Sequence, residues 1–308
     1  MKKALIFGGS GFLGHHLRTE LASDYEVVSL GSDDCDLMDI NETIITLRSI
    51  KPDYIFHLAA YVGGIGLNKD NPAKMFHKNM QMGINILEAH KDYPECKLIV
   101  VGTVCSYPKY AEVPFKEDNI WNGYPEETNA PYGIAKKALL VMGQSYAKQY
   151  GSKVIFAIPS NLYGTHDNFD RYSSHVIPAM IDKIHEAKTS GLSKVTLWGT
   201  GTPTREFLNA KDCASALAFL AKNYDDIDPV NIAVNNDISI KDLAQKISNI
   251  VEFDGTIEWD KSKPDGQPRR RVDNSRLLAL GYNEPFTPLD DGLRETYEWF
   301  RTSDRKVH

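Results

Sequence analysis

The sequence predicts an α/β protein with a doubly wound parallel sheet and a smaller C-terminal α/β domain. Three observations support this prediction. A glycine-rich turn directly follows an apolar segment at the N-terminus. Strand-like and helix-like segments then alternate along the first hundred residues. The length of 308 residues corresponds to about two domains, or to one large α/β unit.

The first strand, residues 3–7, ends at three glycines that are spaced by three, and a helix follows to about residue 21. Gly8 would allow a sharp turn, Gly11 a close approach to a pyrophosphate, and Gly14 tight packing of the helix on the strand. The free N–H groups at the start of the helix would bind the phosphates. An ordinary glycine-rich turn is the alternative, but the position directly after a strand favours a dinucleotide-binding (Rossmann) turn.

The elements that follow indicate a parallel sheet, because strands and helices alternate. In such sheets, ligands bind beyond the carboxyl ends of the strands. The expected strands are 3–7, 26–30, 54–58, 97–101, 154–158, 194–198 and 230–234, and the expected helices are 11–21, 41–49, 72–90, 131–150, 178–188, 211–223, 240–251 and 289–301.

The end of the second strand is where the adenosine ribose would lie. An acidic residue there would bind the 2′-hydroxyl of NAD, and a basic residue the 2′-phosphate of NADP. Gly31 is neither, Ser32 could bond either group, and Asp33 would repel a phosphate. Asp36 is a candidate for the adenine amino group, with a simple turn residue as the alternative. This segment leaves the choice between the two cofactors open.

One strand end, one helix start and the segment before a later helix carry candidate catalytic groups. Thr103 follows the strand 97–101 and could bond a substrate oxygen; Cys105 could act as acid, base or nucleophile, although a single cysteine is more often a core residue. Tyr132 and Lys136 lie four apart, on one face of a helix. We expect the lysine charge to lower the pKa of the phenol toward the range of a general acid. His175, taken alone, is more often structural.

Composition narrows the class of protein. The net charge is −6, so we expect no basic surface that binds nucleic acid. The short basic segment Arg269-Arg270-Arg271 is an exception, and it indicates either a solvated loop or a pocket for a ligand phosphate. The four cysteines form no CxxC pair and no metal site is expected. No apolar run approaches the ~20 residues that span a bilayer, so we expect no membrane partner and a cytoplasmic location.

The motifs together resemble the extended short-chain dehydrogenase/reductase superfamily, and within it the GDP-4-keto-6-deoxy-mannose epimerase-reductases. The resemblance covers nearly the whole chain. Its most specific segments are His57-Leu58-Ala59-Ala60 with Val62-Gly63-Gly64, Cys105-Ser106-Tyr107-Pro108, Pro159-Ser160-Asn161-Leu162-Tyr163-Gly164, His166-Asp167-Asn168-Phe169, Ser174-His175-Val176-Ile177-Pro178, Trp198-Gly199-x-Gly201-x-Pro203-x-Arg205-Glu206-Phe207 and Lys263-Pro264-Asp265-Gly266.

The resemblance implies roles for individual residues. Tyr132 would donate a proton to the C4 oxygen, Lys136 would lower its pKa and hold the nicotinamide ribose, and Thr103 would replace the family's serine. Cys105 and His175 would be the acid/base pair that inverts C3 and C5. The motifs and the resemblance together predict a cofactor site made of Gly8, Gly9, Ser10, Gly11, Phe12, Leu13, Gly14, Ser32, Asp36, Ala59, Val101, Gly102, Thr103, Val104, Lys136, Pro159, Ser160, Asn161, Leu162 and His175, and a GDP-sugar site made of Lys183, Trp198, Arg205, Asp265 and Arg270.

The expected reaction is C3/C5 epimerisation of a GDP-4-keto-6-deoxy-D-mannose, then reduction of its C4 ketone to give GDP-L-fucose. The resemblance favours NADP(H), with NAD(H) as the alternative, because no Lys or Arg occurs from Gly31 through Asp39 or at Ser10. There are three other hypotheses. The enzyme could act on another nucleotide-activated sugar, or it could be a C4 epimerase or dehydratase that recycles a tightly held NAD. The chain could also be a non-catalytic nucleotide sensor. A dehydratase would need an acidic residue where Val104 and Cys105 stand.

The domain boundaries and the oligomeric state are also expectations. We expect residues 1–160 with about 205–235 to form the NADP-binding domain, and about 161–204 with 236–308 to form the substrate domain. The resemblance implies a homodimer through the helix that carries Lys136 and the helix over residues 72–90.

Overall fold

The computed structural model describes residues 1–263 and 265–303. Pro264 of the Lys263–Gly266 motif and residues 304–308 of the expected substrate domain lie outside the described residues. Within the described ranges, no helix is long and apolar enough to cross a bilayer.

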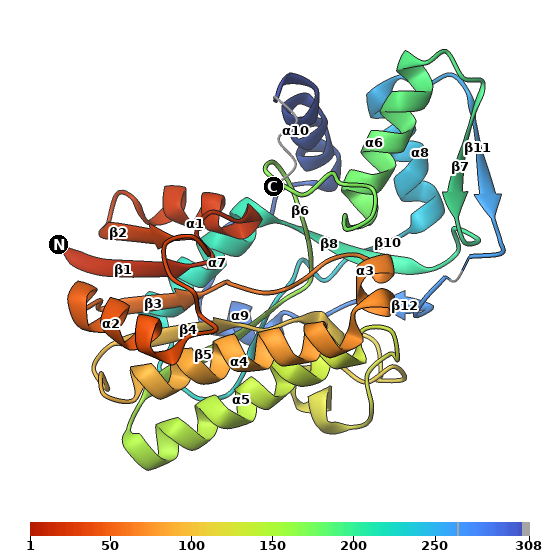
Figure 1. Cartoon of the computed structure of the whole chain (residues 1–308). Helices are drawn as coiled ribbons and strands as arrows, with labels where there is room; N and C mark the ends of the chain where they lie inside the picture. Colours follow the sequence, from red (N-terminus) through yellow and green to blue (C-terminus); the bar gives the residue numbers. More distant parts are fainter. Residues whose placement is uncertain (264, 304–308) are drawn as a thin grey trace.

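A parallel six-stranded sheet forms the larger part of the molecule (Figure 1). Its strands, in spatial order, are β2 (Tyr25–Leu30), β1 (Lys2–Phe7), β3 (Tyr54–His57), β4 (Lys97–Val101), β5 (Lys153–Pro159) and β9 (Val230–Ile232). The strand order reverses at β1, which is the point where a doubly wound sheet binds its ligand. The predicted fold class is therefore confirmed.

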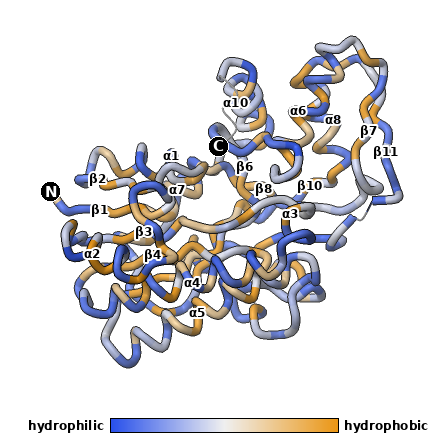
Figure 2. Tube along the Cα trace, in the orientation of Figure 1, coloured by the Kyte–Doolittle hydropathy of each residue, from blue (hydrophilic) through white to orange (hydrophobic). Residues whose placement is uncertain are grey.

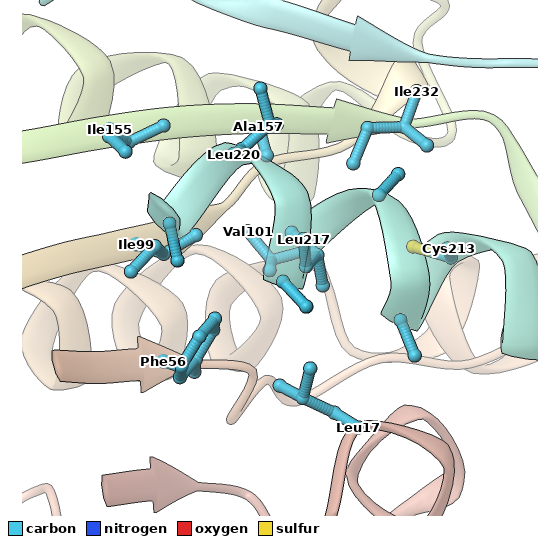
Figure 3. Packing of buried hydrophobic residues seen from close by; sticks show 14 of the residues in the cluster. Leu17, Phe56, Ile99, Val101, Ile155, Ala157, Cys213, Leu217, Leu220 and Ile232 are labelled. Atoms are coloured by element: carbon cyan, nitrogen blue, oxygen red, sulfur yellow. The ribbon is translucent and has the colours of Figure 1, made fainter. Parts of the chain in front are cut away.

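Helices cover both faces of this sheet. The helices α1 (Phe12–Leu21) and α7 (Ala210–Asn223) pack on one face, and α2 (Ile40–Ile50), α4 (Pro72–His90) and α5 (Ala130–Tyr150) on the other. Alternation along β1 explains both layers, because Ile6 joins the first core cluster and Leu5 and Phe7 join the second. Figure 3 shows the first cluster, where Leu217 and Leu220 of α7 lie over Ile99 and Ala157.

The second part of the molecule is built from short strands. In one sheet β8 (Thr204–Asn209) pairs with β6 (Asn161–Tyr163), β10 (Asp237–Ser239) and β12 (Arg269–Arg270); in another, β7 (Lys194–Trp198) pairs with β11 (Thr256–Asp260). The helices α6 (Val176–Thr189), α8 (Ile240–Val251) and α10 (Leu289–Thr302) share a third core cluster with these strands. Figure 2 shows hydrophobic residues where α6 and α8 meet.

The pairing of β8 bears on the expected domain boundary. This strand belongs to the small sheet, whereas α7 and β9, which follow it, pack with the large sheet. A division of the chain by its sheets would therefore fall near residue 210 rather than 205. The elements without a predicted counterpart are short: α3 (Ile65–Asp70), η1 (Val104–Ser106), η2 (Glu117–Trp121), β6, β8, β10, β11, β12 and α9 (Ser275–Ala279).

Candidate active site

The glycine-rich turn forms a tight cradle at the start of α1. Gly8 has a φ of +82°, and a Cβ there would lie 2.6 Å from the backbone nitrogen of Ala59. A Cβ at Gly14 would lie 2.6 Å from the Gly8 oxygen, so the helix packs directly on the turn. At Gly11 an added Cβ meets only the Gly8 oxygen, at 3.3 Å. The first-turn N–H groups of α1 have no acceptor within the helix and are available to an anion.

Gly9 differs from the other glycines of this turn. Its N–H donates to the oxygen of Leu30 at 2.9 Å, and a Cβ there would lie 1.9 Å from Ser29 Oγ. Gly9 therefore packs against β2 and does not line the cavity described below. The contact of Gly9 with a cofactor stays a prediction, and the structure shows that its small size is needed for close packing of the turn on β2.

A cavity of about 1040 Å³ runs from this cradle across the carboxyl ends of β1, β3, β4 and β5 to the small sheet. Every residue of the predicted cofactor, catalytic and GDP-sugar sites lines this cavity, except Gly9 and Lys136. Residues that are distant in sequence, from Gly8 to Arg270, thus share one space.

The start of α5 and the end of β4 meet at the predicted catalytic residues. The Thr103 hydroxyl accepts the N–H of Cys105 at 3.2 Å and is also hydrogen-bonded to the side chain of Tyr132. A Cβ at Gly133 would lie 2.2 Å from the Cys105 oxygen, and Ser106 Oγ donates to the Gly133 oxygen at 2.9 Å. The glycine next to Tyr132 thus allows the phenol and the cysteine segment to approach.

Burial shifts the pKa values of Tyr132 and Lys136 in opposite directions. Enclosure by protein raises the pKa of Tyr132, Cys105 raises it further, and the bond with Thr103 opposes the shift. The expected lowering of this pKa by Lys136 is wrong for this structure, because burial outweighs every other influence on the phenol. Lys136 is 1 % exposed, and burial lowers its pKa to about 8. It does not line the cavity, and its charge also lowers the pKa of the buried His57.

Two arginines lie beside Cys105. Arg270 is buried; its Nη1 is 3.7 Å from Cys105 Sγ, and its Nε donates to Gln267 Oε1 at 3.2 Å. Burial and the charge of Arg270 lower the pKa of Arg205 to about 10. Two guanidinium groups this close make this part of the cavity positive, which suits an anionic ligand.

His175 comes from a different element, directly before α6. Its side chain is exposed, and the surface that it exposes is part of the cavity wall. Enclosure by the surrounding protein lowers the pKa of this imidazole, so it is neutral at pH 7 and can accept a proton. The structure therefore places an imidazole and a thiol in the cavity that holds the Thr103–Tyr132 pair.

The outer end of the cavity carries Trp198, which is 58 % exposed. The Nζ atoms of Lys183 and Lys263 lie 5.3 and 5.4 Å from the centre of its ring. Asp265 already has protein partners, because its carboxylate accepts the N–H of Thr200 at 2.7 Å and the Thr200 hydroxyl at 2.8 Å. Asp265 thus holds the turn after β7, and its direct contact with a substrate stays a prediction.

Sequence reasoning missed Glu126, a buried carboxylate that lines the cavity. Its Oε2 accepts from the Thr128 hydroxyl at 2.6 Å and from Asn129 Nδ2 at 2.8 Å, and its charge raises the pKa of Arg205. No motif marks this residue; only its position six residues before Tyr132 could have drawn attention to it.

Glu206 was part of a motif, but its role was also missed. It is fully buried and accepts the N–H groups of Val272 at 2.8 Å and Asn235 at 2.5 Å. Burial raises the pKa of Glu206 to about 7, although the backbone hydrogen bonds that it accepts lower this pKa. The bond to Val272 fixes the chain just after Arg270, so Glu206 helps to position the arginine that faces Cys105.

The chain belongs to the NAD dependent epimerase/dehydratase family, whose sequence profile matches residues 4–234. Within this class it is similar over nearly its whole length to GDP-L-fucose synthases. It is 42% identical over 300 residues to the GDP-L-fucose synthase of Sinorhizobium fredii (strain NBRC 101917 / NGR234), covering 97% of this chain and 95% of the relative. These findings confirm the resemblance that the motifs predicted.

Two solved structures share the fold. A GDP-L-fucose synthetase from Naegleria fowleri bound to NADP has a TM-score of 0.90 at 30% identity, covering 97% of this chain and 94% of that one. A GDP-6-OMe-4-keto-L-xylo-heptose reductase from C. jejuni has a TM-score of 0.92 at 28% identity, covering 98% of each chain.

Proposed function

We propose that this chain is an NADP(H)-dependent epimerase-reductase that converts GDP-4-keto-6-deoxy-D-mannose to GDP-L-fucose. The observation that carries the proposal is the presence of Cys105 and His175 in the same cavity as the Thr103–Tyr132 pair. The full-length similarity to GDP-L-fucose synthases supports the substrate, and the NADP-bound relative supports the cofactor.

The first half of the reaction is proton exchange next to a ketone. The C4 carbonyl acidifies the hydrogens on C3 and C5, so a base can remove each proton and an acid can return it on the opposite face. Cys105 and His175 have the chemistry for these two roles. Hydrogen bonds from Thr103 and Tyr132 to the C4 oxygen would stabilise the enolate that forms between the two steps. The Arg270 guanidinium stabilises negative charge on Cys105 while it holds no proton.

The second half is reduction of the same carbonyl. When bound, the nicotinamide supplies a hydride to C4. Tyr132 supplies the proton to the oxygen, and its raised pKa keeps the phenol protonated at neutral pH, as a donor must be. Lys136, four residues further along α5, would hold the ribose and place positive charge near the phenol.

The residues present fit a dinucleotide. The cradle of Gly8, Gly11 and Gly14 leaves the first-turn N–H groups of α1 free for a pyrophosphate. Ala59 and the strand ends at Val101 and Pro159 line the adjoining part of the cavity. The GDP-sugar would occupy the other end, among Lys183, Trp198, Arg205, Asp265 and Arg270, with the two parts of the molecule acting as cofactor and substrate domains.

Two further proposals concern the whole protein. A homodimer through α4 and α5 is supported by apolar side chains on these neighbouring helices, since Phe76 is 42% and Val141 46% exposed. The expected cytoplasmic location stays a proposal.

A second candidate is a reductase that acts on another GDP-4-keto sugar without epimerisation. The similarity to the C. jejuni heptose reductase favours this candidate.

The proposed function predicts that one NADPH is oxidised for each GDP-4-keto-6-deoxy-D-mannose consumed, measured by absorbance with the purified chain. Turnover of the sugar without net NADPH oxidation would contradict it and would indicate a cofactor-recycling epimerase.

A further inference from the structure

We propose that the adenosine end of the cofactor site does not select for a 2′-phosphate, so that this chain binds NAD(H) about as tightly as NADP(H). The inference rests on the proposed function only in that a nicotinamide dinucleotide occupies the cavity. It concerns the residues around the exit of β2, which the catalytic argument does not use.

Ser10 and the exit of β2 form one wall of the cavity. A Cβ on Gly31 would lie 2.6 Å from Ser10 Oγ, so the glycine-rich turn and the β2 exit are in direct contact. Gly31 and Ser32 line the cavity together with Ser10. This is the position at which a doubly wound sheet distinguishes a ribose hydroxyl from a ribose phosphate. Two hydroxyls and a glycine therefore stand where a 2′-phosphate would need a cation.

Carboxylates already use backbone donors of this segment. Asp34 Oδ2 accepts the N–H of Gly31 at 2.8 Å, and Glu42 Oε2 accepts the N–H of Asp36 at 2.8 Å. Asp36 Oδ1 in turn accepts the N–H of Met38 at 2.9 Å. A phosphate at this end would thus lie near exposed carboxylates, of which Asp36 lines the cavity and Asp34 lies beside Gly31, whereas a ribose hydroxyl could donate to one of them.

The cations of the cavity lie elsewhere. Among the described residues that line it, the lysines and arginines are Lys78, Arg171, Lys183, Arg205 and Arg270, all later in the chain than β3. Lys78 lies over the ring of Tyr61, at 5.2 Å from its centre. Arg171 is paired with Asp182, and Arg270 faces Cys105. On α1, Arg18 is exposed, contacts His15 at 3.5 Å and does not line the cavity.

These contacts indicate that the 2′-phosphate adds little to the binding free energy of the cofactor. Hydrogen bonds from the Ser10 and Ser32 hydroxyls favour it, and repulsion by the exposed carboxylates, weakened by solvent and salt, opposes it. The expected result is a small difference between the two cofactors, in contrast to the strong preference that a bidentate arginine–phosphate pair would give.

The test is calorimetric binding to the full chain without sugar substrate. Dissociation constants are measured for NADP⁺ and NAD⁺, and for adenosine 2′,5′-bisphosphate and adenosine 5′-monophosphate, which differ only by the 2′-phosphate. We expect each pair to agree within about 5-fold, or about 1 kcal/mol. NADP⁺ binding more than about 30-fold tighter than NAD⁺ would overturn the proposal.

A gain-of-function variant makes the test sharper. Ser10 is exposed, so Ser10→Arg has room to place a guanidinium at the β2 exit. This variant should raise the ratio of the NAD⁺ to the NADP⁺ dissociation constant by at least about 10-fold. The neutral control Ser10→Gln lengthens the side chain without adding a charge, so it should change this ratio by less than about 3-fold.

Asp34→Asn provides a second variant, because it removes one charge and keeps an acceptor for the Gly31 N–H. It should tighten NADP⁺ by about 3-fold and leave NAD⁺ unchanged. If neither Ser10→Arg nor Asp34→Asn changes the ratio of the two constants, the proposal is wrong. Because no sugar is present, these outcomes do not depend on whether the proposed reaction occurs.

Discussion

Cys105 and His175 differ in what surrounds them. The Arg270 guanidinium lies 3.7 Å from the Cys105 sulfur, whereas enclosure by protein lowers the pKa of the His175 imidazole and keeps it neutral. The cavity therefore holds a cysteine beside a cation and a neutral imidazole. The proposed epimerisation needs one group that removes a proton from carbon and one that returns a proton on the opposite face, and these two side chains can share those roles.

Cys105→Ser tests the role of the thiol. A hydroxyl is a much weaker acid than a thiol, so we expect incorporation of solvent deuterium at C3 and C5 to fall by about 100-fold or more. Direct reduction of the C4 ketone should persist in part, measured as NADPH oxidation. Cys35→Ser is a matched control, because Cys35 lines the same cavity and already accepts a hydrogen bond from Thr46 at 3.4 Å. Unchanged exchange in Cys105→Ser would reject the assignment.

Lys136→Met tests the cost of burying a charge. A pKa lowered from 10.5 to about 8 corresponds to roughly 3 kcal/mol against the charged form. The unfolded chain keeps this proton up to its ordinary pKa, so it binds more protons than the folded chain between pH 8 and 10.5, and stability rises with pH there.

In the cofactor-free protein, Lys136→Met should therefore raise the free energy of unfolding at pH 7 by about 1–3 kcal/mol and remove this rise with pH. Reduction should be lost at the same time. The measurement is denaturant unfolding at pH 7 and pH 9.5 for both proteins. A variant less stable than the original at pH 7 would show that the lysine is satisfied in its buried position.

At the scale of elements, the contact between α5 and η1 decides the site geometry. Gly133 has no room for a side chain, because a Cβ would lie 2.2 Å from the Cys105 oxygen. Gly133→Ala should push the two segments apart, destabilise the protein by about 1–3 kcal/mol and reduce turnover by more than about 10-fold.

The matched control is Gly66→Ala in α3. A Cβ at Gly66 meets its nearest atom, the Tyr172 oxygen, at an ordinary 3.5 Å, so stability should be unchanged or slightly higher. Thermal unfolding and NADPH oxidation measure both variants. Wild-type turnover in Gly133→Ala would contradict the importance of this contact.

The elements also show what the sequence could predict. Segments such as β4 and α4 were predicted with their exact bounds, because a short, continuously buried apolar run and amphipathic helical spacing carry that information locally. The two-residue strand β12 and the N–H groups that surround Glu206 were not predicted, because they depend on partners 29 to 66 residues away in the sequence. The raised pKa of Tyr132 was missed for a similar reason, since burial is a property of the assembled cavity.

For the whole molecule, the proposed dimer gives a direct prediction. Val141 lies on α5, next to α4, and a charge there would be buried in the interface. The purified chain should have twice its monomer mass by light scattering, and Val141→Glu should shift it to a monomer. Ile45→Glu on α2, at a residue 63% exposed, is the control and should remain dimeric. A monomeric unmodified chain would contradict the proposed assembly.

The central claim is that one cavity performs both epimerisation and reduction. The most direct measurement is NMR of the product formed from GDP-4-keto-6-deoxy-D-mannose and NADPH in deuterated water. The account predicts GDP-L-fucose with deuterium at C3 and C5 and hydrogen at C4. A reduced sugar that keeps the D-manno configuration at C3 and C5 and contains no deuterium there would contradict it.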